Sequence, residues 1–252
     1  MNSQDVLSGS KRLHFLDLPL DVGADIDLVC AKLRERSGPF EVSFINPYAW
    51  AVAKRDPSFI AMLEKLSLVM ADGVGVSYAC RALTRNPCNR VSFDMTSLAN
   101  PFFKTLQDAN LSLALVGGEL GVDESVKDKL EAHYSGLRIV ETTHGYDDLE
   151  PKVATIMAKA PDAVLVGMGS PRQERFLIAL REAGYRGFAI TCGGFFDQYL
   201  VSDKYYPDWI NRWNLRFLYR LYKEPGRLWR RYLIDYQVYL KRLLREILIR
   251  RQ

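Results

Sequence analysis

The sequence has few cysteines and no long hydrophobic run. Its four cysteines lie far apart without CxxC spacing, which argues against a zinc site and against a disulfide framework. No stretch of roughly 18 uncharged apolar residues is present. Residues 1–15 contain no apolar segment of the kind that marks a signal peptide. We therefore expect a cytoplasmic protein that is neither secreted nor membrane-spanning.

Two common nucleotide-binding motifs are also missing. The first predicted strand is followed by Pro19-Leu20-Asp21 and not by GxGxxG, and the chain has no Walker A loop. A soluble dinucleotide oxidoreductase is therefore disfavoured. We expect the protein to need no cofactor.

Metal ligands are equally sparse. Asp25-Ile26-Asp27 fits the loose DxD pattern with which many transferases hold a metal, but it opens a predicted helix, where acidic residues favour the N-terminus. The three histidines are scattered, and only His144 follows a predicted strand. We expect no metal site.

The composition is that of a folded protein, with 48% hydrophobic and 25% charged residues. The net charge of +4 is unevenly distributed. Residues 212–252 hold 12 Lys/Arg against 3 Asp/Glu, a local charge of +9, whereas residues 1–211 hold 22 against 27, or −5. The C-terminal tail is thus strongly basic, whereas the rest of the chain is acidic.

Short apolar runs alternate with amphipathic segments, as expected for strands covered on both faces and for the helices that cover them. The pattern predicts an α/β fold: a Rossmann-like, mostly parallel sheet with helices on both faces, plus a C-terminal helical appendage. We place the core at residues 1–205 and the appendage at 206–252. The predicted strands are Leu13–Leu18, Val42–Ile45, Leu68–Ala71, Leu111–Val116, Leu137–Thr142, Ala163–Val166 and Phe188–Thr191, and the clearest helices are Asp25–Ser37, Gly73–Leu83, Val122–Tyr134 and Pro171–Ala183.

Ligands bind beyond the carboxyl ends of the strands in such sheets, so the residues that follow each run are candidates for the site. Glycine-rich turns there let backbone N–H groups approach a phosphate, although such turns are also common for packing alone. The candidate substrate-binding residues chosen at these ends are Asn46, Gly73, Gly117, Gly118, His144, Gly169, Ser170 and Gln173.

Asp72 has two interpretations. At the end of a strand its carboxylate can point into the cleft and serve as a general base. It could instead cap the helix that begins near Gly73. Spacing alone favours neither.

Several motifs, taken in order, resemble the WecG/TagA/CpsF glycosyltransferases (glycosyltransferase family 26). The resemblance extends from about Leu13 to the basic tail. The residues that carry it are Ala71-Asp72-Gly73-Val74-Gly75, Arg90-Val91, Thr143-His144-Gly145-Tyr146 and Gly167-Met168-Gly169-Ser170-Pro171-Arg172-Gln173-Glu174.

The resemblance implies an inverting, metal-independent transferase that adds a sugar from a UDP-sugar to an undecaprenyl-diphosphate-linked saccharide. It implies that Asp72 is the catalytic base and that Arg90 stabilises the diphosphate leaving group. The family's glutamine and strand-end asparagine fall on Gln173 and Asn46. One departure is Phe44, which stands where related members carry threonine.

The tail mixes basic and aromatic residues, a pattern that fits an anionic membrane surface, a packing surface or, less well, nucleic acid. Pro225-Gly226 should divide it into two helices. Family members use such an appendage to dock on the membrane and to complete the active site with arginines. We therefore expect a peripheral protein on the inner face of the cytoplasmic membrane, without nucleic acid, and Arg216, Arg220 and Arg227 are the tail candidates.

A rival function is a non-catalytic nucleotide-binding scaffold within a membrane polysaccharide-synthesis complex. The sequence leaves open which sugar is transferred, the acceptor saccharide and whether the chain forms a homo-oligomer.

Overall fold

The computed structural model describes residues 10–202, 205–213 and 215–250. The core is a six-stranded sheet in the order β4-β3-β8-β7-β5-β6, and every neighbouring pair is parallel. Six of the seven predicted runs form these strands, which confirms the predicted fold class. The strands are β3 (Phe40–Ile45), β4 (Leu68–Ala71), β5 (Ser112–Gly117), β6 (Arg138–Thr143), β7 (Ala163–Gly167) and β8 (Phe188–Thr191).

The first predicted strand, Leu13–Leu18, is wrong. This segment turns back on itself as an antiparallel hairpin of β1 (Lys11–Phe15) and β2 (Leu18–Val22), which lies outside the parallel sheet. Leu16 and Asp17 both have positive φ, the geometry of a two-residue hairpin turn. The apolar run continues through this turn because Leu16 is itself buried.

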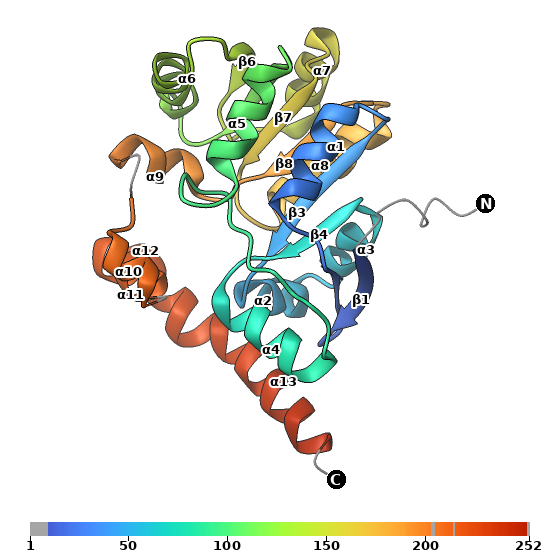
Figure 1. Ribbon diagram of the computed structural model, residues 1–252, viewed down its shortest axis with the longest axis vertical. Coiled ribbons are helices and arrows are strands. Elements are labelled where there is room, and N and C mark those ends of the chain that lie inside the picture. Colours follow the sequence, from blue (N-terminus) through green and yellow to red (C-terminus); the bar gives the residue numbers. More distant parts are fainter. Residues whose placement is uncertain (1–9, 203–204, 214, 251–252) are drawn as a thin grey trace, which may run out of the picture.

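Helices cover both faces of the sheet (Figure 1). Strand side chains alternate between two hydrophobic clusters, one on each face: Leu113 belongs to the first and its neighbour Ala114 to the second. Helices α1, α5, α6 and α9 contribute to the first cluster, and α2, α3, α4, α7 and α8 to the second. Their bounds are α1 (Ile26–Glu35), α2 (Tyr48–Arg55), α3 (Ser58–Lys65), α4 (Val74–Thr84), α5 (Ala99–Asp108), α6 (Val122–His133), α7 (Leu149–Lys159), α8 (Arg172–Glu182) and α9 (Phe195–Val201).

The described part of the tail, residues 206–213 and 215–250, is helical and has more helices than the two predicted. The break lies at Glu224, and Pro225 takes the first position of the next helix, where its missing N–H costs no helical hydrogen bond. The tail elements are α10 (Asp208–Arg212), α11 (Arg216–Lys223), α12 (Pro225–Arg230), the π-helix η1 (Arg231–Asp235) and α13 (Tyr236–Ile249).

The tail is anchored on the core through α13, which packs along α2 (Figure 1). Tyr239 is buried, its ring lies 4.7 Å from that of Trp50, and its hydroxyl donates to the Gly75 carbonyl at 3.0 Å. Farther along α13, Arg242 forms two hydrogen bonds of 2.7 and 2.8 Å with Asp17 in the hairpin turn. The boundary at residue 206 stays a prediction. Within the described ranges, no helix combines the length and the apolar character needed to cross a bilayer.

Candidate active site

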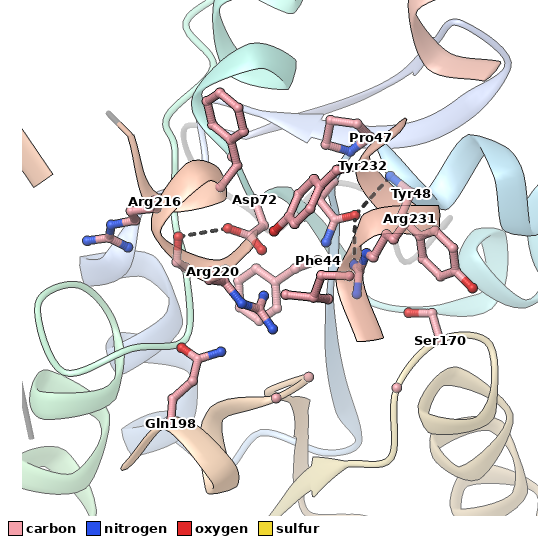
Figure 2. A pocket seen from close by; sticks show the side chains of 18 of the residues that line it. Phe44, Pro47, Tyr48, Asp72, Ser170, Gln198, Arg216, Arg220, Arg231 and Tyr232 are labelled. Carbon is pink, nitrogen blue, oxygen red and sulfur yellow. Dashed lines mark hydrogen bonds between the residues drawn. The ribbon is translucent and has the colours of Figure 1, made fainter. Parts of the chain in front are cut away.

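A cavity of about 1100 Å³ lies at the carboxyl edge of the sheet, and the tail helices form its opposite wall (Figure 2). The parallel strands explain its position, because their carboxyl ends all meet at this edge. The sequence-predicted residues that line it are Asn46, Asp72, Gly73, Arg90, Gly118, Gly169, Ser170, Gln173, Arg216 and Arg220.

Two further predicted residues, Gly117 and His144, are not among those that line the cavity. Gly117 lies just outside, and a side chain there would meet the Gly167 carbonyl oxygen at 2.4 Å, so this glycine lets the ends of β5 and β7 approach. His144 faces Asp147, with 3.4 Å between Nε2 and Oδ2. The side chain of Arg227 lies outside the described part of the chain.

Asp72 directly follows β4. Its backbone N–H donates to the Ile45 carbonyl at 2.8 Å, which continues the pairing with β3. Helix α4 has Gly73 as its N-cap, so the capping interpretation of Asp72 is wrong. Its carboxylate instead lines the cavity, and Oδ1 accepts a hydrogen bond of 2.7 Å from the Ser92 hydroxyl.

Arg90 is brought beside Asp72 by an isolated bridge between its own backbone and that of Ala71. Its Nη2 donates to Ser92 Oγ at 2.9 Å. Burial and the nearby charge of Arg216 lower the pKa of Arg90. The guanidinium nevertheless remains a cation at any working pH.

Two tail arginines bring unused donors to the cavity wall. Arg220 and Arg231 each have a buried Nε that makes no hydrogen bond within the described residues. Arg231 also donates through Nη2 to Asn46 Oδ1 at 3.3 Å and lies 4.3 Å from the centre of the Tyr48 ring. A half-buried guanidinium group with an unused Nε–H donor suits an anionic ligand such as a diphosphate.

Arg216 differs from these two because its guanidinium is already engaged. It forms an ion pair of 2.5 Å with Asp94 and donates to Thr96 Oγ1 at 2.6 Å. It also lies 4.7 Å from the centre of the Tyr206 ring. Arg216 thus ties α11 to the loop that carries Arg90 and Ser92.

The turn between β7 and α8 is organised around Glu174, a fully buried residue. Glu174 Oε1 accepts hydrogen bonds of 2.9 Å from Ser43 Oγ, Ser170 Oγ and Gln173 Nε2. Burial raises the pKa of Glu174. The Gln173 amide oxygen has no partner within the described ranges, so it is available to accept from a ligand.

Ser92, Arg231 and Glu174 were not among the site residues predicted from the sequence. Glu174 belongs to the motif at residues 167–174, so the sequence did indicate that this residue could matter for the site. Ser92 and Arg231 carried no such signal, because a serine after Arg90-Val91 and one more arginine in a basic tail are ordinary residues.

No cluster of three or more His, Cys, Asp or Glu side chains suited to a metal occurs in the described ranges. The Asp25 carboxylate of the DxD pattern accepts from the Leu28 N–H at 2.9 Å and caps α1. That interaction gives the first acid of the pattern a helix-capping role.

Comparison with known proteins gives one consistent family. Residues 13–252 match the Glycosyl transferase WecG/TagA/CpsF family. A Shigella boydii UDP-Gal:alpha-D-GlcNAc-diphosphoundecaprenol beta-1,4-galactosyltransferase is 28% identical and covers 83% of this chain and 87% of its own. Two N-acetylglucosaminyldiphosphoundecaprenol N-acetyl-beta-D-mannosaminyltransferases are similar: that of Bacillus subtilis (30% identical, covering 76% and 74%) and that of Bacillus spizizenii (28%, covering 80% and 77%).

Proposed function

The chain belongs to the WecG/TagA/CpsF family of glycosyl transferases, and from this membership we propose that it moves a sugar, with inversion, from a UDP-sugar onto an undecaprenyl-diphosphate-linked saccharide in cell-surface polysaccharide synthesis. One observation carries the proposal: a carboxylate at a strand end and two half-buried arginines, each with a buried and unused Nε donor, line the same cavity. The relatives' names support the donor and the lipid-linked acceptor.

In the proposed mechanism Asp72 is the general base. It removes the proton from the acceptor hydroxyl as that oxygen attacks the anomeric carbon from the face opposite the nucleotide. The bond between the anomeric carbon and the diphosphate oxygen breaks, and UDP leaves with the bonding electrons. A single displacement of this kind inverts the anomeric configuration.

The leaving diphosphate needs compensating positive charge. We assign this role to Arg90, Arg220 and Arg231, together with backbone N–H groups of the glycine-rich turns at Gly118 and Gly169. Preorganised donors in a cavity that excludes water stabilise developing charge without reorganisation. The positive groups come from both the core and the tail, so the tail would contribute to chemistry as well as to location.

The tail is also our candidate for membrane docking. Most of the exposed large hydrophobic side chains in the described ranges lie on it, including Trp213, Tyr222, Leu244 and Leu248. Residues 212–252 of the tail also carry a net charge of +9. Apolar and basic groups on one segment suit the anionic inner face of the cytoplasmic membrane, where the acceptor lipid would be anchored.

The experiment is a panel of UDP-sugars, UDP-galactose and UDP-N-acetylmannosamine among them, with a short-chain prenyl-diphosphate-linked N-acetylglucosamine as acceptor. We expect transfer from one donor and an inverted anomeric linkage in the product. Nucleotide binding without transfer from any donor would favour the scaffold function instead. Phe44 lines the cavity, so its replacement by threonine should change the donor preference if the sugar lies against β3.

Asp72→Asn tests the base. The substitution keeps the shape of the side chain but removes the basic carboxylate, so turnover should fall roughly 10²- to 10⁴-fold while UDP-sugar binding persists. Asp108→Asn, on an exposed residue at the end of α5, is the matched control and should retain activity. Near-normal turnover in Asp72→Asn would remove this residue from the role.

A further inference from the structure

We propose that Ser92 is a positioning residue that occupies Oδ1 of Asp72 and thereby leaves Oδ2 as the atom that accepts the proton from the acceptor hydroxyl. The proposal rests on the proposed function of Asp72. It adds a residue to the site and assigns different tasks to the two oxygens of the base.

The direction of the hydrogen bonds follows from elementary chemistry. The Arg90 guanidinium has only donors, so its Nη2 donates to Ser92 Oγ across 2.9 Å. The serine hydroxyl has a single proton, and the ionised Asp72 carboxylate has none to offer. That proton must therefore lie on the 2.7 Å hydrogen bond from Ser92 Oγ to Asp72 Oδ1.

Oδ2 has no such partner. Within the described part of the chain, Asp72 Oδ2 accepts no hydrogen bond. Figure 2 shows the dashed hydrogen bond to one carboxylate oxygen of Asp72 only. Asp72 lines the cavity, so this oxygen can reach a bound hydroxyl. A base whose first oxygen is fixed presents its second oxygen in one orientation, which removes a rotational cost from the reacting complex.

Ser92 can hold Asp72 in place because its own backbone is held. Its N–H donates to Ser97 Oγ at 3.3 Å, and its carbonyl accepts from the backbone N–H groups of Asp94 and Leu98 at 3.0 and 3.1 Å. The residue is 7% exposed. A buried hydroxyl on a fixed backbone is the kind of support that keeps a catalytic side chain in a productive rotamer.

Three groups that lie close to the Asp72 carboxylate are Arg90, Tyr206 and Tyr236. Arg90 stays positive, as stated above. Tyr206 and Tyr236 lie near the carboxylate from the tail, and burial raises the pKa of both phenols. These three neighbours therefore keep their charge state between mildly acidic and neutral pH.

The test compares Ser92→Ala with Ser92→Thr. The alanine variant loses the hydrogen bond to Oδ1, so kcat should fall about 10- to 100-fold while KM for the UDP-sugar stays within about twofold. Threonine keeps the hydroxyl and should restore most of kcat.

Ser77→Ala is the control, because Ser77 is a buried serine on α4 outside the cavity lining. It should leave kcat unchanged. An unchanged kcat in Ser92→Ala, or equal losses in the alanine and threonine variants, would overturn the positioning role.

A second measurement separates this proposal from the proposed function. The carboxyl-carbon NMR resonance of Asp72, recorded at neutral pH without substrate, should move in Ser92→Ala and return in Ser92→Thr, because the hydrogen bond to Oδ1 is lost and then restored. An unmoved resonance in Ser92→Ala would refute the Ser92 proposal even if transfer is observed. A moved resonance in a protein that transfers no sugar would support the hydrogen bond and refute the proposed function.

Discussion

At the scale of single residues, the site depends on polar groups that do not themselves line the cavity. Glu174 is the clearest case: it is completely buried, and it holds Ser170 and Gln173 in place from behind. A neutral carboxyl and an amide offer the same acceptor oxygen at this place. The residue can therefore be tested by a substitution that keeps the acceptor and removes the acidity.

Glu174→Gln should change the pH dependence of stability. Burial raises the pKa of Glu174 above its ordinary value of 4.5, so the folded state binds the proton more tightly than the unfolded chain does. That contribution is fully present below pH 4.5 and is lost as the pH rises through the raised pKa. Denaturant unfolding at several pH values should show the unsubstituted protein losing stability relative to Glu174→Gln as pH rises.

The exposed Glu182→Gln, at the end of α8, serves as control and should give no such divergence. Stability curves that run parallel between pH 4 and pH 8 for the unsubstituted protein and Glu174→Gln would show that burial of Glu174 does not govern this dependence.

At the scale of elements, the segment between α4 and α5 connects the base to the tail. Arg90 and Ser92 face Asp72, while Asp94 and Thr96 hold Arg216 of α11. The side chains of the Arg216–Asp94 pair are only 16% and 11% exposed, so water screens the pair weakly. The Arg216 guanidinium is thereby engaged with Asp94 and Thr96, and direct binding of a diphosphate would have to replace these interactions.

A double-mutant cycle on Arg216→Met and Asp94→Asn distinguishes these tasks. If Arg216 mainly ties α11 to the loop, the two substitutions should couple by about 2 kcal/mol in the free energy of unfolding. Each should also weaken UDP-sugar binding to a similar degree. A direct diphosphate ligand would instead give a much larger loss of binding in Arg216→Met than in Asp94→Asn, with little coupling.

The pair of Arg242 and Asp17 is a useful reference for this cycle. It has comparable hydrogen bonds of 2.7 and 2.8 Å, but the Asp17 side chain is 65% exposed. Its coupling free energy should stay below about 1 kcal/mol, as is usual for surface pairs.

At the scale of the whole molecule, basic charge and most of the exposed large hydrophobic side chains in the described ranges are concentrated on one segment, the tail. The tail is basic, whereas the rest of the chain is acidic, and α13 extends from the cavity toward the C-terminus along α2 (Figure 1). An anionic bilayer would therefore attract the tail and repel much of the core. Such an orientation would turn the tail wall of the cavity toward the acceptor lipid.

Vesicle sedimentation tests this orientation. The protein should sediment with vesicles that contain anionic lipid, and binding should weaken as salt is raised from about 0.1 M to 0.5 M, because salt screens exposed charges. Leu244→Ser combined with Leu248→Ser should reduce binding about 10-fold, since both leucines are exposed on α13. Leu120→Ser changes an exposed leucine outside the tail and should leave vesicle binding unchanged. Equal binding by all variants would contradict docking through α13.

Sugar transfer should also survive a chelator. The proposed neutralisation of the diphosphate relies on Arg90, Arg220 and Arg231, and guanidinium groups need no divalent ion for this purpose. Initial rates with and without excess chelator, after extensive dialysis, should agree within about twofold. A strict requirement for added magnesium or manganese would overturn this and return attention to Asp25 and Asp27.

Much of the core could be predicted from the sequence because the patterns that indicate strands and helices are local. Runs that are apolar on both faces indicate buried parallel strands, and the carboxyl ends of such strands meet at one edge. Asn46, Asp72 and Ser170 could therefore be assigned to one site from strand ends alone. The same rules failed at Leu16 and Asp17, because a run that stays buried through a turn gives no sign of the positive φ that reverses it.

By itself, the sequence determined the fold class, the family and the carboxyl edge that carries the site. Only the tertiary structure decided which side chains meet there: Arg216 with Asp94, Arg231 with Asn46, and Ser92 with Asp72. Periodicity reports which face of an element is buried, but hydrogen bonds between residues up to 225 positions apart depend on how whole elements pack. The donor and acceptor roles at the base follow from that packing, because a serine proton can go to only one partner.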